Sequence, residues 1–204
     1  VILVRDATFD SAAAPVVVNP GARILVSDGG GLTLKGALAN AGALAVGDSA
    51  SYSYTDLRVS GAVELDGAGK VTLAASANGY AWLVGVAGSA ASLVNNGQTI
   101  SGAGGIGYGS DGALAFDNKA GIVNANVSGR AITLATGNLV NNEATLEATG
   151  GGVLDVYDSL ANAAGALAAL TGGEIVLRCA VTGGLVKAAG AGSLVSVQSQ
   201  ISGA

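Results

Sequence analysis

Three pairs of carboxylates are the first candidates for chemistry in this sequence. Hydrolysis of a glycosidic bond needs two carboxyl groups about 5–9.5 Å apart. Glu64 and Asp66 are two residues apart in an alternating segment, so their side chains share one strand face at a separation of about 6–7 Å. The other two pairs are Asp155 with Asp158 and Glu143 with Glu147.

Each pair also has a simpler interpretation, which we favour. Glu64 and Asp66 alternate with aliphatic residues, as expected where a half-buried strand turns its charges toward water. Asp155 and Asp158 differ in parity along their segment and are predicted to face apart. The third pair flanks an asparagine turn, where the charges resemble edge charges. We therefore expect no catalytic residues and no enzymatic activity.

Metal and thiol chemistry are the next candidates. The chain has no histidine, and Cys179 is its single cysteine, which excludes an internal disulfide. A nucleophilic cysteine needs a base beside it, and zinc needs several His and Cys ligands, so we expect Cys179 to be a buried core residue. The segment GGIGYGSDG at 104–112 is similar to the Gly-Asp nonapeptide of calcium β-rolls, which works only in tandem copies. No cofactor is expected, with calcium as the remaining alternative.

The aromatic residues offer a possible ligand contact. Tyr52, Tyr54, Tyr80 and Trp82 form the main aromatic concentration in a chain that is only 4% aromatic. Exposed aromatic rings can stack on sugars or anchor a protein partner. Packing in the core or under a loop is the alternative, and the sequence favours it.

The composition limits the classes of protein to which the chain can belong. It has 204 residues, 34 glycines and only 11% charged residues, with a net charge of −5. The basic residues are scattered, whereas a nucleic-acid surface needs clustered Lys and Arg. No apolar run approaches the roughly 20 residues that span a bilayer. The sequence starts without methionine or a leader pattern, so we expect a piece of a longer polypeptide.

The elements that must position these residues are short strands. Aliphatic residues recur at every second position in pulses of three to five residues, which is the pattern of a β-strand. Glycine and asparagine pairs separate the pulses and favour tight turns. The clearest pulses are LTL (32–34), VTL (71–73), ITL (132–134), VLDVY (153–157) and LVSV (194–197).

Asparagine marks a longer repeat. The predicted structural turns are centred on Asn40, Asn95, Asn118, Asn141 and Asn162, and the last three intervals are 23, 23 and 21 residues. A fixed period of this size with short strands predicts an all-β fold, a right-handed parallel β-helix with coils of about 20–23 residues. We expect one domain over 1–204, less regular over 47–92. An antiparallel sandwich or a propeller is the rival fold.

Several phrases carry a resemblance to a known class of proteins. They are NNGQTISGAGGIG (95–107), NKAGIVNAN (118–126), LVNNEATLEATGGGVL (139–154) and GGLVKAAGAGSL (183–194). These segments resemble repeats of bacterial secreted β-solenoid adhesins, namely autotransporter passengers and filamentous-haemagglutinin-like exoproteins. The resemblance implies secretion or display on the bacterial cell surface and no catalytic residues. Cys179 departs from it, because such passengers usually avoid cysteine.

We therefore expect a structural or adhesive surface protein, a β-helical stalk or fibre-forming segment of an adhesin. Its expected partners are further copies, head-to-tail or lateral, and a host or matrix surface that can carry glycans. We expect neither nucleic acid binding nor a membrane span. Two alternatives stay open: a carbohydrate-active β-helix enzyme, such as a polysaccharide lyase or tailspike-like depolymerase, and a glycan-binding module.

Overall fold

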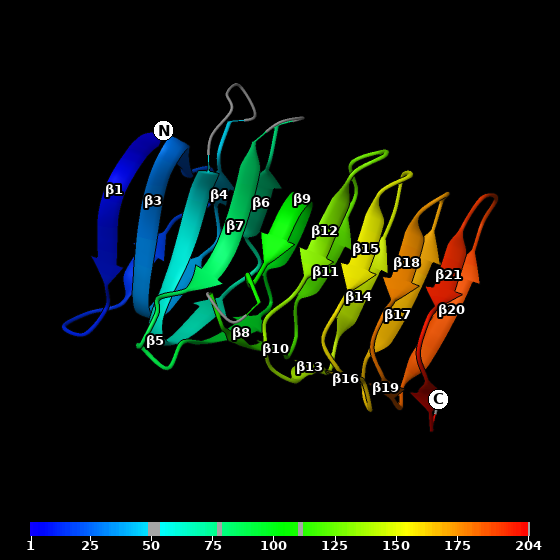
Figure 1. The fold of residues 1–204 in the computed structure, drawn as a ribbon. Coiled ribbons are helices and arrows are strands. Elements are labelled where there is room, and N and C mark those ends of the chain that lie inside the picture. The colour runs from blue at the N-terminus through cyan, green and yellow to red at the C-terminus, as the bar shows by residue number, and fades with distance from the viewer. Residues whose placement is uncertain (49–53, 77–78, 110–111, 204) are drawn as a thin grey trace.

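The computed structural model describes residues 1–48, 54–76, 79–109 and 112–203 (Figure 1). Within these ranges the chain forms 22 strands and no helix. The strands pair in parallel with strands one turn earlier and one turn later, and the isolated Asp66–Gly97 bridge is the one antiparallel pairing between described residues. The protein is therefore a parallel β-helix, and the predicted fold class is confirmed.

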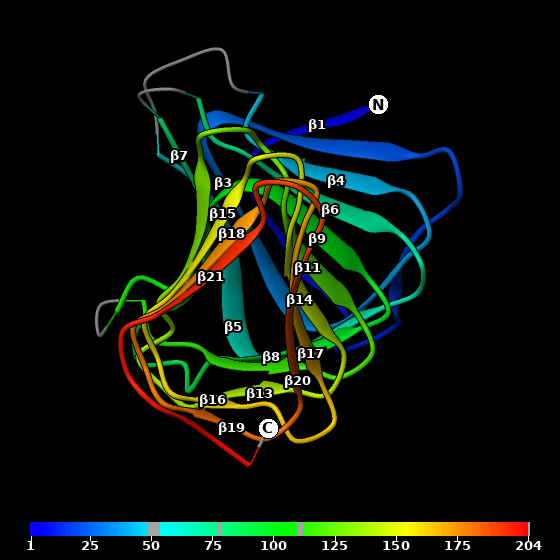
Figure 2. The same cartoon turned by 90° about the vertical axis from the view of Figure 1, so that its right-hand side faces the viewer.

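Figure 2 looks along the helix axis from the C-terminal end and shows three faces around one interior. The chain runs counterclockwise in this view while it advances toward the viewer, so the β-helix is right-handed. We name the faces A, B and C in the order in which each turn visits them. Each level of strand on a face is called a rung.

Each face has nine rungs in the described part of the chain. Face A holds parts of β1 (Ile2–Asp10), β3 (Arg23–Asn40) and β9 (Thr99–Ile106), with β4 (Ala43–Val46), β6 (Lys70–Ala74), β11 (Ile122–Ala125), β14 (Thr145–Ala148), β17 (Ala166–Leu170) and β20 (Leu185–Ala189). Face B holds other parts of β1, β3 and β9, part of β5 (Tyr54–Asp66), and β7 (Tyr80–Gly85), β12 (Ala131–Leu134), β15 (Val153–Val156), β18 (Glu174–Leu177) and β21 (Leu194–Val197). Face C holds the ends of β3 and β5, and β2 (Val16–Val18), β8 (Ser92–Asn96), β10 (Ala115–Asn118), β13 (Val140–Asn142), β16 (Leu160–Ala161), β19 (Val181–Thr182) and β22 (Ile201–Ser202).

The strand register on face A measures the length of each coil. Nine aliphatic residues lie above one another there: Ile2, Ile24, Leu44, Val71, Ile100, Val123, Leu146, Leu167 and Val186. Their spacing gives coils of 22, 20, 27, 29, 23, 23, 21 and 19 residues. The two longest coils lie between Leu44 and Ile100, and their additional residues fall between strands, so the register of the faces is kept.

The interior is a narrow column of aliphatic side chains. Alternate residues of each strand point inward, and most of those on the central rungs are almost fully buried. Phe116 is the one aromatic side chain among the fully buried ones in the described residues, because three closely spaced sheets leave little room for rings. Burying each Leu, Ile or Val contributes about 1.5–3 kcal/mol. The buried aliphatic residues run from Val4 to Val181, so this stabilisation is distributed along the axis.

Candidate functional site

The aromatic residues are brought together on face B by the parallel register. Tyr54 begins β5 and Tyr80 begins β7, and these two residues are direct register partners. Their ring centroids are 5.1 Å apart with an interplanar angle of 17°, so the rings are stacked. Tyr54 is 65% exposed and Tyr80 is 49% exposed. Two residues separated by 26 positions in the sequence thus form an outward-facing pair.

Trp82 continues this stack within β7. It lies two residues after Tyr80 and so points to the same side of the strand, with the ring centroids 5.8 Å apart. Its register partner on the next coil is Gly105. A Cβ atom on Gly105 would lie 2.0 Å from Cζ3 of Trp82, so the indole lies directly over the glycine backbone. The glycine is what allows the ring to lie there.

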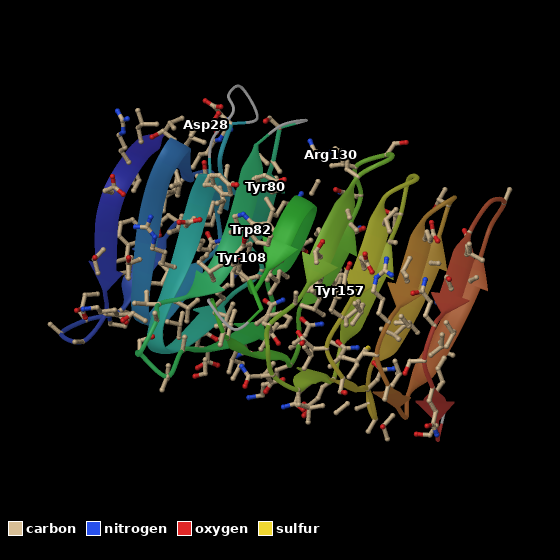
Figure 3. The ribbon with its side chains drawn as sticks, viewed as in Figure 1. Asp28, Tyr80, Trp82, Tyr108, Arg130 and Tyr157 are labelled. Carbon is tan, nitrogen blue, oxygen red and sulfur yellow. The ribbon has the colours of Figure 1, made fainter. Side chains whose placement is uncertain are left out.

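Two further tyrosines extend the aromatic surface along face B (Figure 3). Tyr108 meets Trp82 edge to face, with the centroids 5.0 Å apart and the planes at 82°. Tyr157 follows β15, and Tyr108 and Tyr157 are 54% and 50% exposed. The sequence analysis selected neither tyrosine, because each stands alone in sequence among glycines or aspartates. Tyr52, which it did select, lies outside the described residues.

Two pockets open beside these rings. One has a volume of about 340 Å³ and is lined by Tyr54, Asp56, Trp82 and Tyr108 together with Val84, Gly85 and Gly112. The other has a volume of about 250 Å³ and is lined by Trp82, Tyr108, Thr133 and Tyr157 with Gly107, Gly109 and Ala135. Trp82 and Tyr108 border both pockets. The pockets therefore form one continuous surface across several coils.

Ion pairs flank the aromatic surface at both ends. At one end Arg58 lies 3.1 Å from Asp56 and 3.8 Å from Asp6. At the other end Arg178 donates two hydrogen bonds to Asp155, of 2.7 and 3.1 Å, and its guanidinium lies 5.0 Å from the ring centroid of Tyr157. The hydrogen bond to Asp155 raises the pKa of Arg178. Asp56 and Asp155 are therefore each already paired with an arginine.

The first candidate carboxylate pair is held by one amide. Glu64 and Asp66 share a side of β5, as predicted, and Nδ2 of Asn96 donates hydrogen bonds to both carboxylates, at 3.0 and 2.7 Å. Both acidic residues lie in the part of β5 that belongs to face C, away from the aromatic surface. The side-chain amide of Asn96 therefore holds the two carboxylates next to each other.

The other acidic candidates also have separate surroundings. Asp155 binds Arg178, whereas Asp158 accepts hydrogen bonds from the backbone N–H and hydroxyl of Thr136, so the prediction that the two aspartates face apart is confirmed. Burial raises the pKa of Glu147, and the charge of Lys187 opposes that rise. Glu143 is exposed after β13. The described residues show no arrangement of these carboxylates around a shared groove.

Asparagines form a second column, inside the corner between faces C and A. Nδ2 of Asn95 donates to Oδ1 of Asn118 at 2.9 Å, and Asn118 donates in the same way to Asn142 at 2.8 Å. Asn142 donates to Asn162 at 2.6 Å, and Asn162 donates to the carbonyl of Gly183 at 3.3 Å. We call these four asparagines the amide ladder. All four are almost completely buried.

The structure corrects one of the predicted turn positions. Asn141 is exposed on β13, and its neighbour Asn142 occupies the ladder, in register with Asn118. The even interval of 23 residues had pointed to Asn141, but the actual intervals are 24 and then 20 residues because consecutive corners differ in length. Asn118 and Asn142 end their strands, and Asn95 lies inside β8.

Asn40 and Gln98 extend this polar interior toward the N-terminal coils. Asn40 donates to Oε1 of Gln98 at 2.7 Å, and Gln98 donates back to the carbonyl of Asn40 at 2.8 Å. The backbone N–H of Gln98 donates to Oδ1 of Asn95 at 3.1 Å. Gln98 therefore links Asn40 to the ladder across the long coil. The sequence analysis did not select Gln98, because it interrupts the asparagine pattern.

Metal and thiol chemistry receive no support from the geometry. The described residues include no group of three or more His, Cys, Asp or Glu side chains that could hold a metal ion. In the segment 104–112, Ser110 and Asp111 lie outside the described residues. Cys179 is buried, as predicted, and burial raises its pKa to about 11. A thiol in this environment stays protonated at neutral pH.

No family model, no curated protein and no solved structure matches this chain. Among the described residues no helix has the length and apolar character needed to cross a membrane. The fold therefore provides the classification: the chain belongs to the class of right-handed parallel β-solenoid repeat proteins.

Proposed function

We propose that this chain is a stiff stalk segment of a secreted or cell-surface bacterial protein, serving adhesion or the assembly of an extracellular fibre. One observation carries the proposal: the parallel register continues on all three faces from the first rung to the last, and the two termini lie at opposite ends of the rod (Figure 1). Eight steps of about 4.8 Å separate the first rung from the ninth by about 38 Å.

The internal hydrogen bonding supports a stalk that resists bending. The central rungs bond to a neighbour on both sides, and the amide ladder adds side-chain bonds parallel to the axis. Bending the rod would have to break several of these bonds together with the aliphatic contacts. The resemblance of 93–204 to repeats of secreted β-solenoid adhesins supports the extracellular setting.

The first experiment tests display on the cell. Intact cells of the source organism are treated with a membrane-impermeant amine-reactive biotin reagent, which can reach the exposed Lys119 and Lys187. We expect labelling of the chain on intact cells, while a cytoplasmic protein is labelled only after lysis. Labelling of this chain only after lysis would contradict the proposal.

A second experiment distinguishes a stalk from a site. Deleting 123–185 removes three whole coils, so that Val186 takes the register position of Val123. A stalk shortened by about 14 Å should still be displayed and should still support adhesion with a shorter reach. Complete loss of adhesion by a variant that is displayed and folded would place the adhesive determinant in the deleted coils and would overturn the stalk assignment.

We further propose that the exposed end rungs are covered by additional coils. Leu185, Leu194 and Val197 are about half exposed on the last coil, whose strands pair on one side only. Another copy could supply the missing rung by parallel edge pairing. In sedimentation velocity the 204-residue chain should then grow in mass with concentration. A constant monomer mass at high concentration would exclude a second copy as the covering element.

A further inference from the structure

The aromatic surface of face B is the strongest unexplained feature of the molecule. We define the aromatic groove by six residues that line its two pockets: Tyr54, Asp56, Trp82, Tyr108, Thr133 and Tyr157. The lining residues come from the coils of β5, β7, β9, β12 and β15, so the groove crosses successive coils. A stalk does not need such a groove, since short polar side chains would serve an outer face equally well.

We propose that the aromatic groove binds a neutral, extended oligosaccharide whose sugar rings lie along the axis of the β-helix. The volumes of the two pockets, about 340 and 250 Å³, lie near the range of small-molecule sites, about 300–1,000 Å³. The continuity of the pockets past Trp82 and Tyr108 fits a chain-like ligand that occupies both. This inference adds a ligand to the rod and does not depend on the stalk proposal.

The chemistry of the groove fits a sugar. The C–H groups on one side of a pyranose ring form an apolar surface that can pack on the aromatic side chains lining the groove. Tyr54, Tyr80, Tyr108 and Tyr157 are between 49% and 65% exposed, and a phenolic O–H can exchange hydrogen bonds with sugar hydroxyls. Thr133 adds a hydroxyl to the second pocket.

The rings are also held in place before any ligand arrives. Tyr54, Tyr80 and Trp82 are stacked on one another, and Tyr108 closes the stack edge to face. Trp82 lies over Gly105, which a larger residue could not replace without moving the indole. Preorganised side chains lose little rotamer freedom when they bind, which increases affinity.

The charge distribution favours a neutral ligand. Asp56 is paired with Arg58, and Asp155 at the far end is paired with Arg178 by two hydrogen bonds. Neither arginine is left free to bind an acidic sugar or a phosphate, and neither carboxylate is free to attract a cation. The whole chain carries a net charge of −5, which repels polyanions further.

The test uses the only tryptophan of the chain, Trp82, which lies inside the groove. Its fluorescence is recorded while cellohexaose, mannohexaose and chitohexaose are each titrated into the purified chain, with a heparin hexasaccharide as the anionic comparison. We expect a saturable shift in emission with at least one neutral hexasaccharide and no saturable shift with the heparin fragment.

Three variants locate the binding. Tyr108→Ala removes the ring shared by the two pockets and should weaken binding at least tenfold. Gly105→Ala leaves every groove side chain present but displaces the indole of Trp82, and it should also weaken binding at least tenfold. Leu139→Ala, an exposed aliphatic residue outside the groove, should bind as the wild type does. Calorimetry measures the same affinities without relying on Trp82, and circular dichroism checks that each variant is folded.

Four outcomes would overturn the proposal. They are the absence of binding to all three neutral hexasaccharides, tighter binding of the heparin fragment, unchanged affinity in folded Tyr108→Ala, and a Trp82 emission shift that follows protein concentration without any sugar. The last outcome would mean that a second copy covers the groove. The cell-labelling result bears on the stalk alone, so failure of one proposal can be told from failure of the other.

Discussion

The amide ladder and the aromatic groove are built by the same device in two different environments. In each, the parallel register places similar side chains above one another on successive coils. Asn118 and Asn142 meet inside the corner between faces C and A, almost fully buried, whereas Tyr54 and Tyr80 meet on face B in contact with water. A solenoid repeat therefore produces columns both inside and outside the same rod.

The two columns differ in how completely their groups are satisfied by contacts within the column. In the ladder Asn118, Asn142 and Asn162 each accept from the asparagine one coil before, and the oxygen of Asn95 accepts from the backbone N–H of Gln98. Each amide donates to the coil after, and the last donor reaches the carbonyl of Gly183. The ladder is therefore satisfied by itself and specifies the fold. The stacked rings satisfy each other only in part, because about half of each tyrosine surface remains exposed. The outer column therefore leaves aromatic surface in contact with water.

The largest expected effect comes from breaking the ladder. Asn142→Ala removes the acceptor of Asn118 and the donor to Asn162, leaving buried polar groups without partners on both sides. Each such group costs about 1–3 kcal/mol, so we expect a loss of about 3–5 kcal/mol in the free energy of unfolding. Denaturant unfolding followed by circular dichroism measures it.

The chain supplies a matched control for this variant one residue away. Asn141→Ala changes the same side chain at an exposed position of the same strand, and we expect a change of at most about 0.5 kcal/mol. Equal losses in the two variants would show that burial and the ladder hydrogen bonds do not distinguish these asparagines.

The same pair shows how far the sequence alone could lead. Period-two pulses and repeated asparagines were enough to predict the parallel β-helix and the length of most coils, because strand alternation and turn chemistry are local. The choice between Asn141 and Asn142 was wrong, because it depends on the length of the corner before β13. Corner length is set by contacts between coils, which a single sequence does not display.

The residues of the aromatic groove could also be predicted only in part from the sequence. Tyr54, Tyr80 and Trp82 were selected because they are close in sequence, and the structure does bring them together. Tyr108 and Tyr157 were missed, although the first touches Trp82. These two tyrosines lie one and three coils beyond Trp82, and only the three-dimensional register brings them onto the same surface.

The second-largest expected effect concerns reactivity in the interior. Cys179 is buried with a pKa raised to about 11, so at pH 8 its thiolate fraction is about 100-fold lower than that of a free thiol. We expect the folded protein to react with an aromatic disulfide reagent at least about 100-fold more slowly than the protein in denaturant. Rapid reaction of the folded chain would show that this part of the interior opens readily.

A smaller loss of stability is expected when a ring is removed from the aromatic stack on face B. Tyr80→Ala removes two ring contacts, with Tyr54 and with Trp82, whereas Tyr54→Ala removes only the first. At about 0.5–1.5 kcal/mol for each aromatic pair, we expect a loss of about 1–2 kcal/mol for Tyr80→Ala and about half of that for Tyr54→Ala. Thermal and denaturant unfolding would measure both. A loss of unfolding free energy as large as that of Asn142→Ala would mean that the aromatic stack matters as much for the stability of the fold as the amide ladder does.

The smallest effect is expected just outside the ladder, at Asp117. Burial raises the pKa of Asp117, and the charge of Glu143 adds to the rise while Lys119 opposes it. Its Oδ1 atom is buried without a hydrogen-bond partner in the described structure. An ionised carboxylate is thus poorly accommodated next to Asn118. Asp117→Asn should therefore increase the free energy of unfolding at pH 7 by about 0.5 kcal/mol.

The pH dependence provides the sharper form of this prediction. Because the pKa is higher in the folded state, Asp117 favours folding most below its unfolded value of about 3.9, and this contribution is lost as the pH rises through the folded pKa. The stability difference between Asp117→Asn and the wild type should therefore grow between pH 3 and pH 7 in urea unfolding. A stability difference that stays constant over this range, or an asparagine variant that is less stable at pH 7, would contradict the prediction. It would mean that the ionised carboxylate of Asp117 is stabilised by its surroundings as fully as the amides of the ladder are by theirs.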